Sequence, residues 1–147
     1  MLTKEDCIQI LNKLEPNSDI TIEFSFIKTL SCNTKKRIIF IGLLELRNHT
    51  YDEMEAGIAH ELGHIKLKHV VGEIERHKAE FEADMYAYQH HRISTYAAIF
   101  SLLKGYKSSD IEDYWYFVSN THPSLLARAI RLGLDAYIFE DIKNEEV

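Results

Sequence analysis

Cysteine is scarce in this sequence, which has only Cys7 and Cys32 among its 147 residues. Their separation matches no cysteine-based metal site, and the pair does not require a disulfide. We therefore expect two free thiols in a protein of a reducing compartment.

Long apolar segments are also missing. The longest, around residues 96–103, is far too short to span a bilayer. Residues 1–6 are acidic where a signal peptide would be basic, and they include no apolar core. No internal repeat or low-complexity segment is visible. These absences predict a soluble, cytoplasmic protein that does not insert into a membrane.

An excess of positive charge is lacking too, since the formal net charge is −6. Together with the absence of a basic stripe, this argues against a nucleic-acid partner. What is present is ordinary for a globular protein: 46% hydrophobic and 27% charged residues. A chain of this length suits one domain, residues 1–147, that buries about two-thirds of its unfolded surface.

The first part of the chain predicts a helix followed by two strands. Thr3 is a cap for the helix, with Asp6 at its third position, and residues 16–17 end it. Its apolar side consists of Ile8, Ile10, Leu11 and Leu14. Residues 20–27 alternate between apolar and polar, as in a half-buried strand. A turn at residues 31–34 then leads to a second strand at 37–41, which we expect to pair antiparallel with the first.

The remaining chain predicts helices. Thr50 favours a cap for a helix at residues 51–70, with Gly57 and Gly63 inside it. Gly57 would leave room beside a bound metal, and Gly63 would let another helix approach closely. Further helices are expected at 75–91, 94–103, from 109, and at 123–132 with Pro123 in its first position. The expected fold class is therefore α+β, a small antiparallel sheet packed on a mainly helical bundle.

One stretch of the expected 51–70 helix carries chemistry: His60-Glu61-Leu62-Gly63-His64. On a helix, residues four apart project from one face, so both imidazoles can bind a single zinc ion. Glu61 lies to the side of that face, where it can take a proton from a zinc-bound water. This is the His-Glu-x-x-His pattern of zinc metallopeptidases.

A catalytic zinc usually takes three protein ligands, so one is still to be found. The metzincin arrangement is excluded, because Leu67 and Val70 stand where it needs glycine and histidine. Glu80 on the next helix is our predicted third ligand. Asp84, one turn further on, would accept the free ring N–H of a ligating histidine. Glu82 is the rival ligand, although it points about 200° around the helix from Glu80.

The other histidines are interpreted as surface residues and not as ligands. They are His49, His69, His77, His90 and His91. His69, five residues beyond His64, falls off the metal face.

These motifs together resemble the HtpX and CAAX-prenyl-protease family of gluzincin metallopeptidases. The first similar run comprises residues 41–44, Glu53, and Ala59 to His64 with His69. The family next carries Glu-x-x-Ala-Asp, matched by Glu80, Ala83 and Asp84. It then carries His-Pro with an arginine six residues after the histidine, matched by His122, Pro123 and Arg128. Most members have membrane helices, so this chain is closer to the small soluble minigluzincins.

The resemblance implies a minimal zincin-like domain with one zinc ion bound by His60, His64 and Glu80. It implies Glu61 as the general base, with Asp84 supporting the ligand set. It also implies catalytic roles for His122 and Arg128. His122 would stabilise the negative charge of the transition state, and Arg128 would hold the loop or contact substrate. Because some minigluzincins are self-blocked, residues 134–147 are expected to be an inhibitory tail or pro-segment.

The sequence therefore predicts a zinc metalloendopeptidase of the gluzincin type. A peptide or protein substrate in extended conformation would add to an edge strand at residues 37–41. One alternative is a zinc-binding regulatory or interaction module with the same fold and no turnover. The other is a structural helical domain in which the motif is coincidental.

Overall fold

The computed structural model describes residues 1–91, 118–119 and 122–132. In chain order its elements are α1 (Lys4–Leu14), β1 (Thr21–Ser25), β2 (Ser31–Asn33), β3 (Ile38–Gly42), α2 (Glu45–Asn48), α3 (Tyr51–Lys66), α4 (Arg76–His91) and α7 (Leu125–Arg131). The predicted α+β class is confirmed. The helices predicted at 94–103 and from 109, and the predicted tail at 134–147, lie outside the described residues.

Helix α1 begins as predicted, because Thr3 and Asp6 form a reciprocal capping box. Its inward face differs from the prediction. Cys7, Ile10 and Leu11 are buried, whereas Ile8 is 38% exposed. Cys7, and not Ile8, faces the core, because positions 7, 10 and 11 lie on one face of the helix and position 8 lies beside that face.

The sheet has three strands in the order β1-β3-β2. The predicted antiparallel pairing of the two longer strands is wrong, because β1 runs parallel to β3. The physical reason is the short strand β2, which replaces the predicted turn at 31–34. It forms an antiparallel hairpin with β3, through a turn that ends at Arg37 with a φ of 58°. That hairpin occupies one edge of β3, and β1 pairs with the other.

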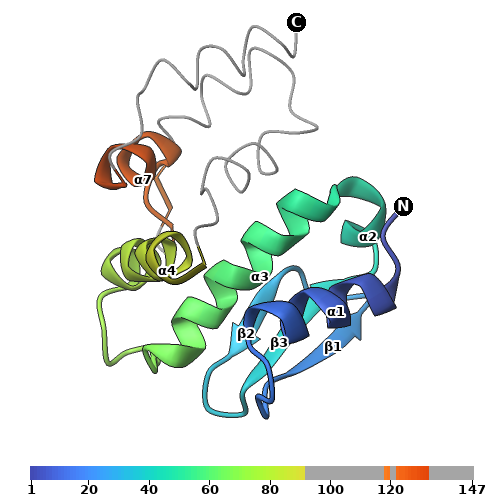
Figure 1. The fold of residues 1–147 in the computed structure, drawn as a ribbon. Helices are drawn as coiled ribbons and strands as arrows, with labels where there is room; N and C mark the ends of the chain where they lie inside the picture. The colour runs from blue at the N-terminus through green and yellow to red at the C-terminus, as the bar shows by residue number, and fades with distance from the viewer. Residues whose placement is uncertain (92–117, 120–121, 133–147) are drawn as a thin grey trace, which may run out of the picture.

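The core lies between one face of this sheet and the helices α1 and α3 (Figure 1). Ile39 and Ile41 of β3, two residues apart, both point into it and are fully buried. Helix α3 contributes Met54, Ile58, Leu62 and Ile65. The helix that carries the His-Glu-x-x-His pattern is therefore anchored by its apolar face, which leaves its other face for the site.

Helix α3 begins at the predicted place, with a capping box between Thr50 and Glu53. It ends at Lys66 and not at Val70. Lys68 adopts a left-handed conformation with a φ of 56°, which stops the helix.

Helix α7 also differs from the prediction, because it begins at Leu125 with Ser124 as its cap. Pro123 precedes this cap and does not occupy the first helical position, since the Ser124 side chain accepts the N–H of Ala127. Within the described part of the chain, no helix is long and apolar enough to cross a bilayer.

Candidate metal centre and active site

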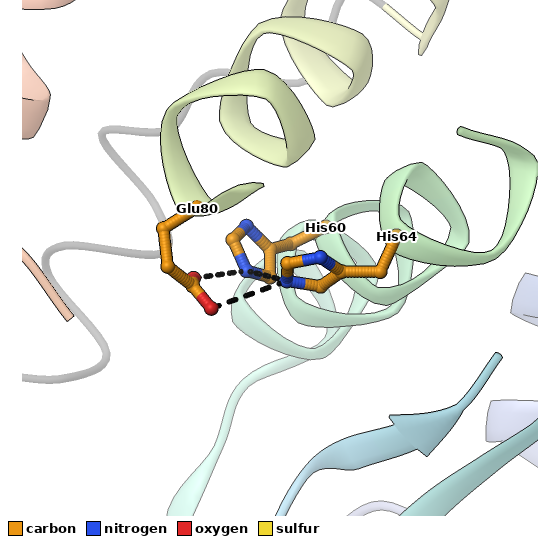
Figure 2. A group of neighbouring side chains, drawn as sticks. All are labelled: His60, His64 and Glu80. Atoms are coloured by element: carbon orange, nitrogen blue, oxygen red, sulfur yellow. Dashed lines mark hydrogen bonds and ion pairs between the residues drawn. The ribbon is translucent and has the colours of Figure 1, made fainter. Parts of the chain in front are cut away.

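His60 and His64 of α3 face Glu80 of α4 (Figure 2). The Nε2 atoms of the two histidines are 3.2 Å apart. Glu80 Oε2 lies 2.8 Å from His60 Nε2, and Glu80 Oε1 lies 3.2 Å from His64 Nε2. The structure thus brings the three predicted ligands together from two helices.

Close packing of α3 on α4 makes this convergence possible. A Cβ at Gly63 would stand 2.9 Å from both the Cα and the carbonyl oxygen of Ala83, so only glycine fits there. The close approach predicted for Gly63 is confirmed. The prediction for Gly57 is wrong. A Cβ there would meet the Leu30 side chain at 2.2 Å, so Gly57 makes room for the core and not for a metal.

The three donor groups fit a zinc ion. Tetrahedral zinc with bonds of about 2.0–2.2 Å needs ligand atoms roughly 3.3 Å apart. The Nε2 atoms of His60 and His64, 3.2 Å apart, match this spacing, and each lies within 3.2 Å of a different Glu80 oxygen. The Glu80 carboxylate lies against both imidazoles, and its Oε2 atom is buried. Two imidazoles and one carboxylate are also the donor set of known catalytic zinc sites.

Asp84 contacts His60 at Nδ1, the ring nitrogen that does not face Glu80. Its Nδ1 lies 2.8 Å from Asp84 Oδ1, and since an ionised carboxylate only accepts, Nδ1 carries the proton. Burial lowers the pKa of His60, but the hydrogen bonds to Asp84 and Glu80 outweigh it and raise the pKa to about 10. Metal binding must therefore displace a proton from Nε2.

Asp84 in turn is paired with Arg128 of α7, a residue 44 positions away in sequence. Arg128 Nε donates to Oδ2 and its Nη2 donates to Oδ1, both at 2.7 Å. Burial raises the pKa of Asp84, but Arg128 and His60 lower it further, to about 2. The side chain of Arg128 is 6% exposed and is turned toward Asp84. Its predicted roles, holding the loop or contacting substrate, stay predictions.

His64 is contacted by His69, contrary to the interpretation of His69 as a surface residue. The two Nδ1 atoms are 2.9 Å apart, and the His69 side chain is only 7% exposed. His69 Nε2 lies 3.4 Å from Glu82 Oε2. Glu82, the rival ligand, therefore points toward His69, and it is not part of the ligand group. Burial, followed by the neighbouring His64, lowers the pKa of His69.

Glu61 is buried on α3, and its carboxylate faces β2 of the sheet. The Cys32 thiol of β2 lies beside it. Burial chiefly, with the Glu61 carboxylate second, raises the pKa of that thiol. No pattern in the sequence connected Cys32 with the site. The predicted edge strand at 37–41 is wrong, because β3 is the central strand and β2 is the edge near Glu61.

His122 lies at the open side of the group. Its Nε2 is 3.7 Å from Glu80 Oε1, and its side chain is 56% exposed. Burial lowers the pKa of His122, although Glu80 opposes this. His122 thus lies beside the ligand group with part of its ring exposed to solvent.

The remaining histidines lie away from the ligand group. His77 Nε2 donates to the Ser119 carbonyl and His49 Nδ1 donates to the Glu45 carbonyl. His90 is exposed and stacks on Tyr86. His91 contacts the edge of the same ring.

Comparison with known proteins matches part of this chain to a protein family. The model of Peptidase family M48 matches residues 26–79, about a third of the chain. This segment contains β2, β3, α3 and the whole His-Glu-x-x-His pattern, and it ends one residue before Glu80. No curated protein and no solved structure matches. The resemblance to this metallopeptidase family is confirmed over the matched segment, and it supports a protease activity.

Proposed function

We propose that this protein is a zinc-dependent endopeptidase of the gluzincin type, with the family match to its motif helix as a premise. The observation that carries the proposal is the convergence of His60, His64 and Glu80 beside Glu61. A zinc ion bound by these three groups would polarise the scissile carbonyl and acidify a water molecule.

The chain's own residues supply the proton transfers. Glu61 follows His60 in sequence and does not share the metal-facing stripe of α3. Its carboxylate takes a proton from the attacking water and delivers it to the leaving amine. His122, at the open side of Glu80, donates a hydrogen bond to the oxygen that becomes negative in the transition state.

An extended peptide or protein substrate pairs with β2. This strand forms an edge of the sheet and lies next to Glu61. Main-chain hydrogen bonds to such an edge align a peptide bond without selecting its side chains. The substrate is thereby presented beside the general base.

The experiment compares zinc content and peptide cleavage across matched variants. Wild-type protein is expected to contain about one zinc per chain and to cleave an unstructured protein such as casein. Glu61→Gln should retain zinc and lose cleavage, and Glu80→Gln should lose both. Glu73→Gln, a change of an exposed glutamate in the connection between α3 and α4, should behave as wild type.

Each departure from this pattern has a clear meaning. Absence of zinc from wild-type protein contradicts the proposed centre. Loss of zinc in Glu61→Gln means that Glu61 is a ligand and not the base. Zinc without cleavage of any peptide in a diverse library favours the regulatory module.

A further inference from the structure

The chain reverses sharply where α3 ends, and this reversal brings His69 back to His64. Lys68 N donates to Ile65 O, and His69 N donates to His64 O at 3.0 Å. These are the two hydrogen bonds of a Schellman motif, with Lys68 in the left-handed position usually taken by glycine. In that motif the last residue packs against the one five positions earlier, so backbone geometry determines the contact.

Such contacts are ordinarily between apolar side chains, but here both are imidazoles. Their Nδ1 atoms are 2.9 Å apart, with ring planes at 70°. At this distance one nitrogen must donate a proton and the other must accept it, because two N–H groups would repel. The far nitrogen of His69, Nε2, lies 3.4 Å from the Glu82 carboxylate on α4.

Metal binding decides the direction of these hydrogen bonds. For Nε2 of His64 to offer a lone pair to a metal, its single proton must be on Nδ1. That proton is then donated to Nδ1 of His69, which must carry its own proton on Nε2 and direct it toward Glu82. His64, His69 and Glu82 then have one protonation pattern that is consistent with metal binding.

We infer that His69 is a positioning residue, which holds His64 in its metal-binding tautomer and orientation, with its own far nitrogen facing Glu82. This inference rests on the proposed zinc centre. It gives the two histidine ligands different support. His60 Nδ1 donates directly to the carboxylate of Asp84, whereas His64 Nδ1 contacts a second imidazole, whose far nitrogen faces the Glu82 carboxylate. Both supports end on α4, so both ligands are oriented by the helix that supplies Glu80.

The test compares zinc affinity by chelator competition in two variants of His69. His69→Leu removes the acceptor, and it should weaken zinc binding by about 10–100-fold. His69→Asn places an amide oxygen close to the lost Nδ1, and it should recover most of the affinity. His90→Leu, a change of an exposed histidine on α4, serves as the control and should bind as wild type. Circular dichroism of the metal-free proteins checks that each variant is folded.

The positions of the ring protons can be measured directly by ¹⁵N NMR of the histidine rings in the zinc-loaded wild type. We expect the proton of His64 on Nδ1 and that of His69 on Nε2. A proton on Nδ1 of His69 would overturn the inference even if His69→Leu does not fold. Equal zinc affinity of His69→Leu and wild type would also overturn it, as would equal weakening in the Leu and Asn variants. Absence of zinc binding by wild type would instead refute the proposed centre.

Discussion

At the residue scale, the site depends on buried polar groups. Because they are shielded from solvent, water cannot take the place of a partner that is removed. Asp84 is 3% exposed and is shared by His60 and Arg128. Removing either partner of a buried ion pair leaves a charge without compensation. Asp84 therefore contacts both a proposed zinc ligand and a buried cation, and the two contacts can be tested separately.

Asp84→Ala should weaken zinc binding by about 10–100-fold, because His60 loses the acceptor that orients its ring. It should also lower the free energy of unfolding by about 3–5 kcal/mol, because the buried Arg128 loses its ion pair with Asp84. Adding Arg128→Met removes the buried charge, and should restore stability without restoring zinc affinity. Urea unfolding and chelator competition measure the two effects. Recovery of both together would show that Asp84 acts only on the fold.

His122→Ala tests the proposed donor to the transition state. Because His122 is largely exposed and is not in the ligand group, zinc content and fold should be unchanged. The kcat on a good peptide substrate should fall by about 10²–10³-fold, the usual effect of losing one oxyanion donor. KM should change little, since the interaction forms mainly in the transition state. A near-normal kcat would reduce His122 to a structural residue.

The sequence indicated the histidine pair and Asp84 behind it, but not the contacts of Arg128 with Asp84 and of His69 with His64, for a physical reason. His60 and His64 are four residues apart, so helix geometry alone puts them on one face. The contact of Arg128 with Asp84 depends on how α7 packs on α4. The contact of His69 with His64 depends on a left-handed Lys68, and no glycine was present to signal it.

At the element scale, the packing of α3 on α4 decides whether the third ligand reaches the other two. Gly63→Ala should force the helices apart, because its Cβ would meet backbone atoms of Ala83 at 2.9 Å. Overpacking of about 1–3 kcal/mol should exceed the gain of about 1 kcal/mol in helix propensity. Because Glu80 moves with α4, zinc affinity should fall as well.

Gly57→Ala is the matched control within the same helix. Its new Cβ would meet only the Leu30 side chain, whose end can rotate and which packs against the core. Zinc affinity should therefore stay at the wild-type level. Chelator competition measures the zinc affinity of both variants. Equal affinities would show that the spacing of α3 and α4 does not control metal binding.

Elements with local signals were predictable, and those fixed by distant pairing were not. The capping boxes at Thr3 and Thr50 involve residues three apart, and Thr3 and Thr50 were both predicted as caps. The parallel pairing of β1 with β3 could not be read from the sequence, because alternation identifies a strand and not its neighbour. The same limit explains why β3 was taken for an edge.

At the scale of the whole molecule, the proposed site joins parts that are far apart in sequence. Helix α3 is anchored in the core with the sheet and α1, whereas α4 contributes Glu80 and Asp84. Helix α7 adds Arg128. Since an unfolded chain does not hold these groups together, zinc should bind the folded state almost alone.

Zinc should therefore stabilise the protein by mass action. At free zinc about 1,000 times the Kd, the expected stabilisation is about 4.1 kcal/mol, which raises Tm by on the order of 10 °C for a chain of this size. Adding a strong chelator should reverse the shift. Glu80→Gln should show a much smaller shift, because its site lacks the ligand from α4. If zinc is bound at one per chain and Tm does not change, zinc must bind the unfolded chain equally well. Its ligands would then lie within one local segment, and α4 would not complete the centre.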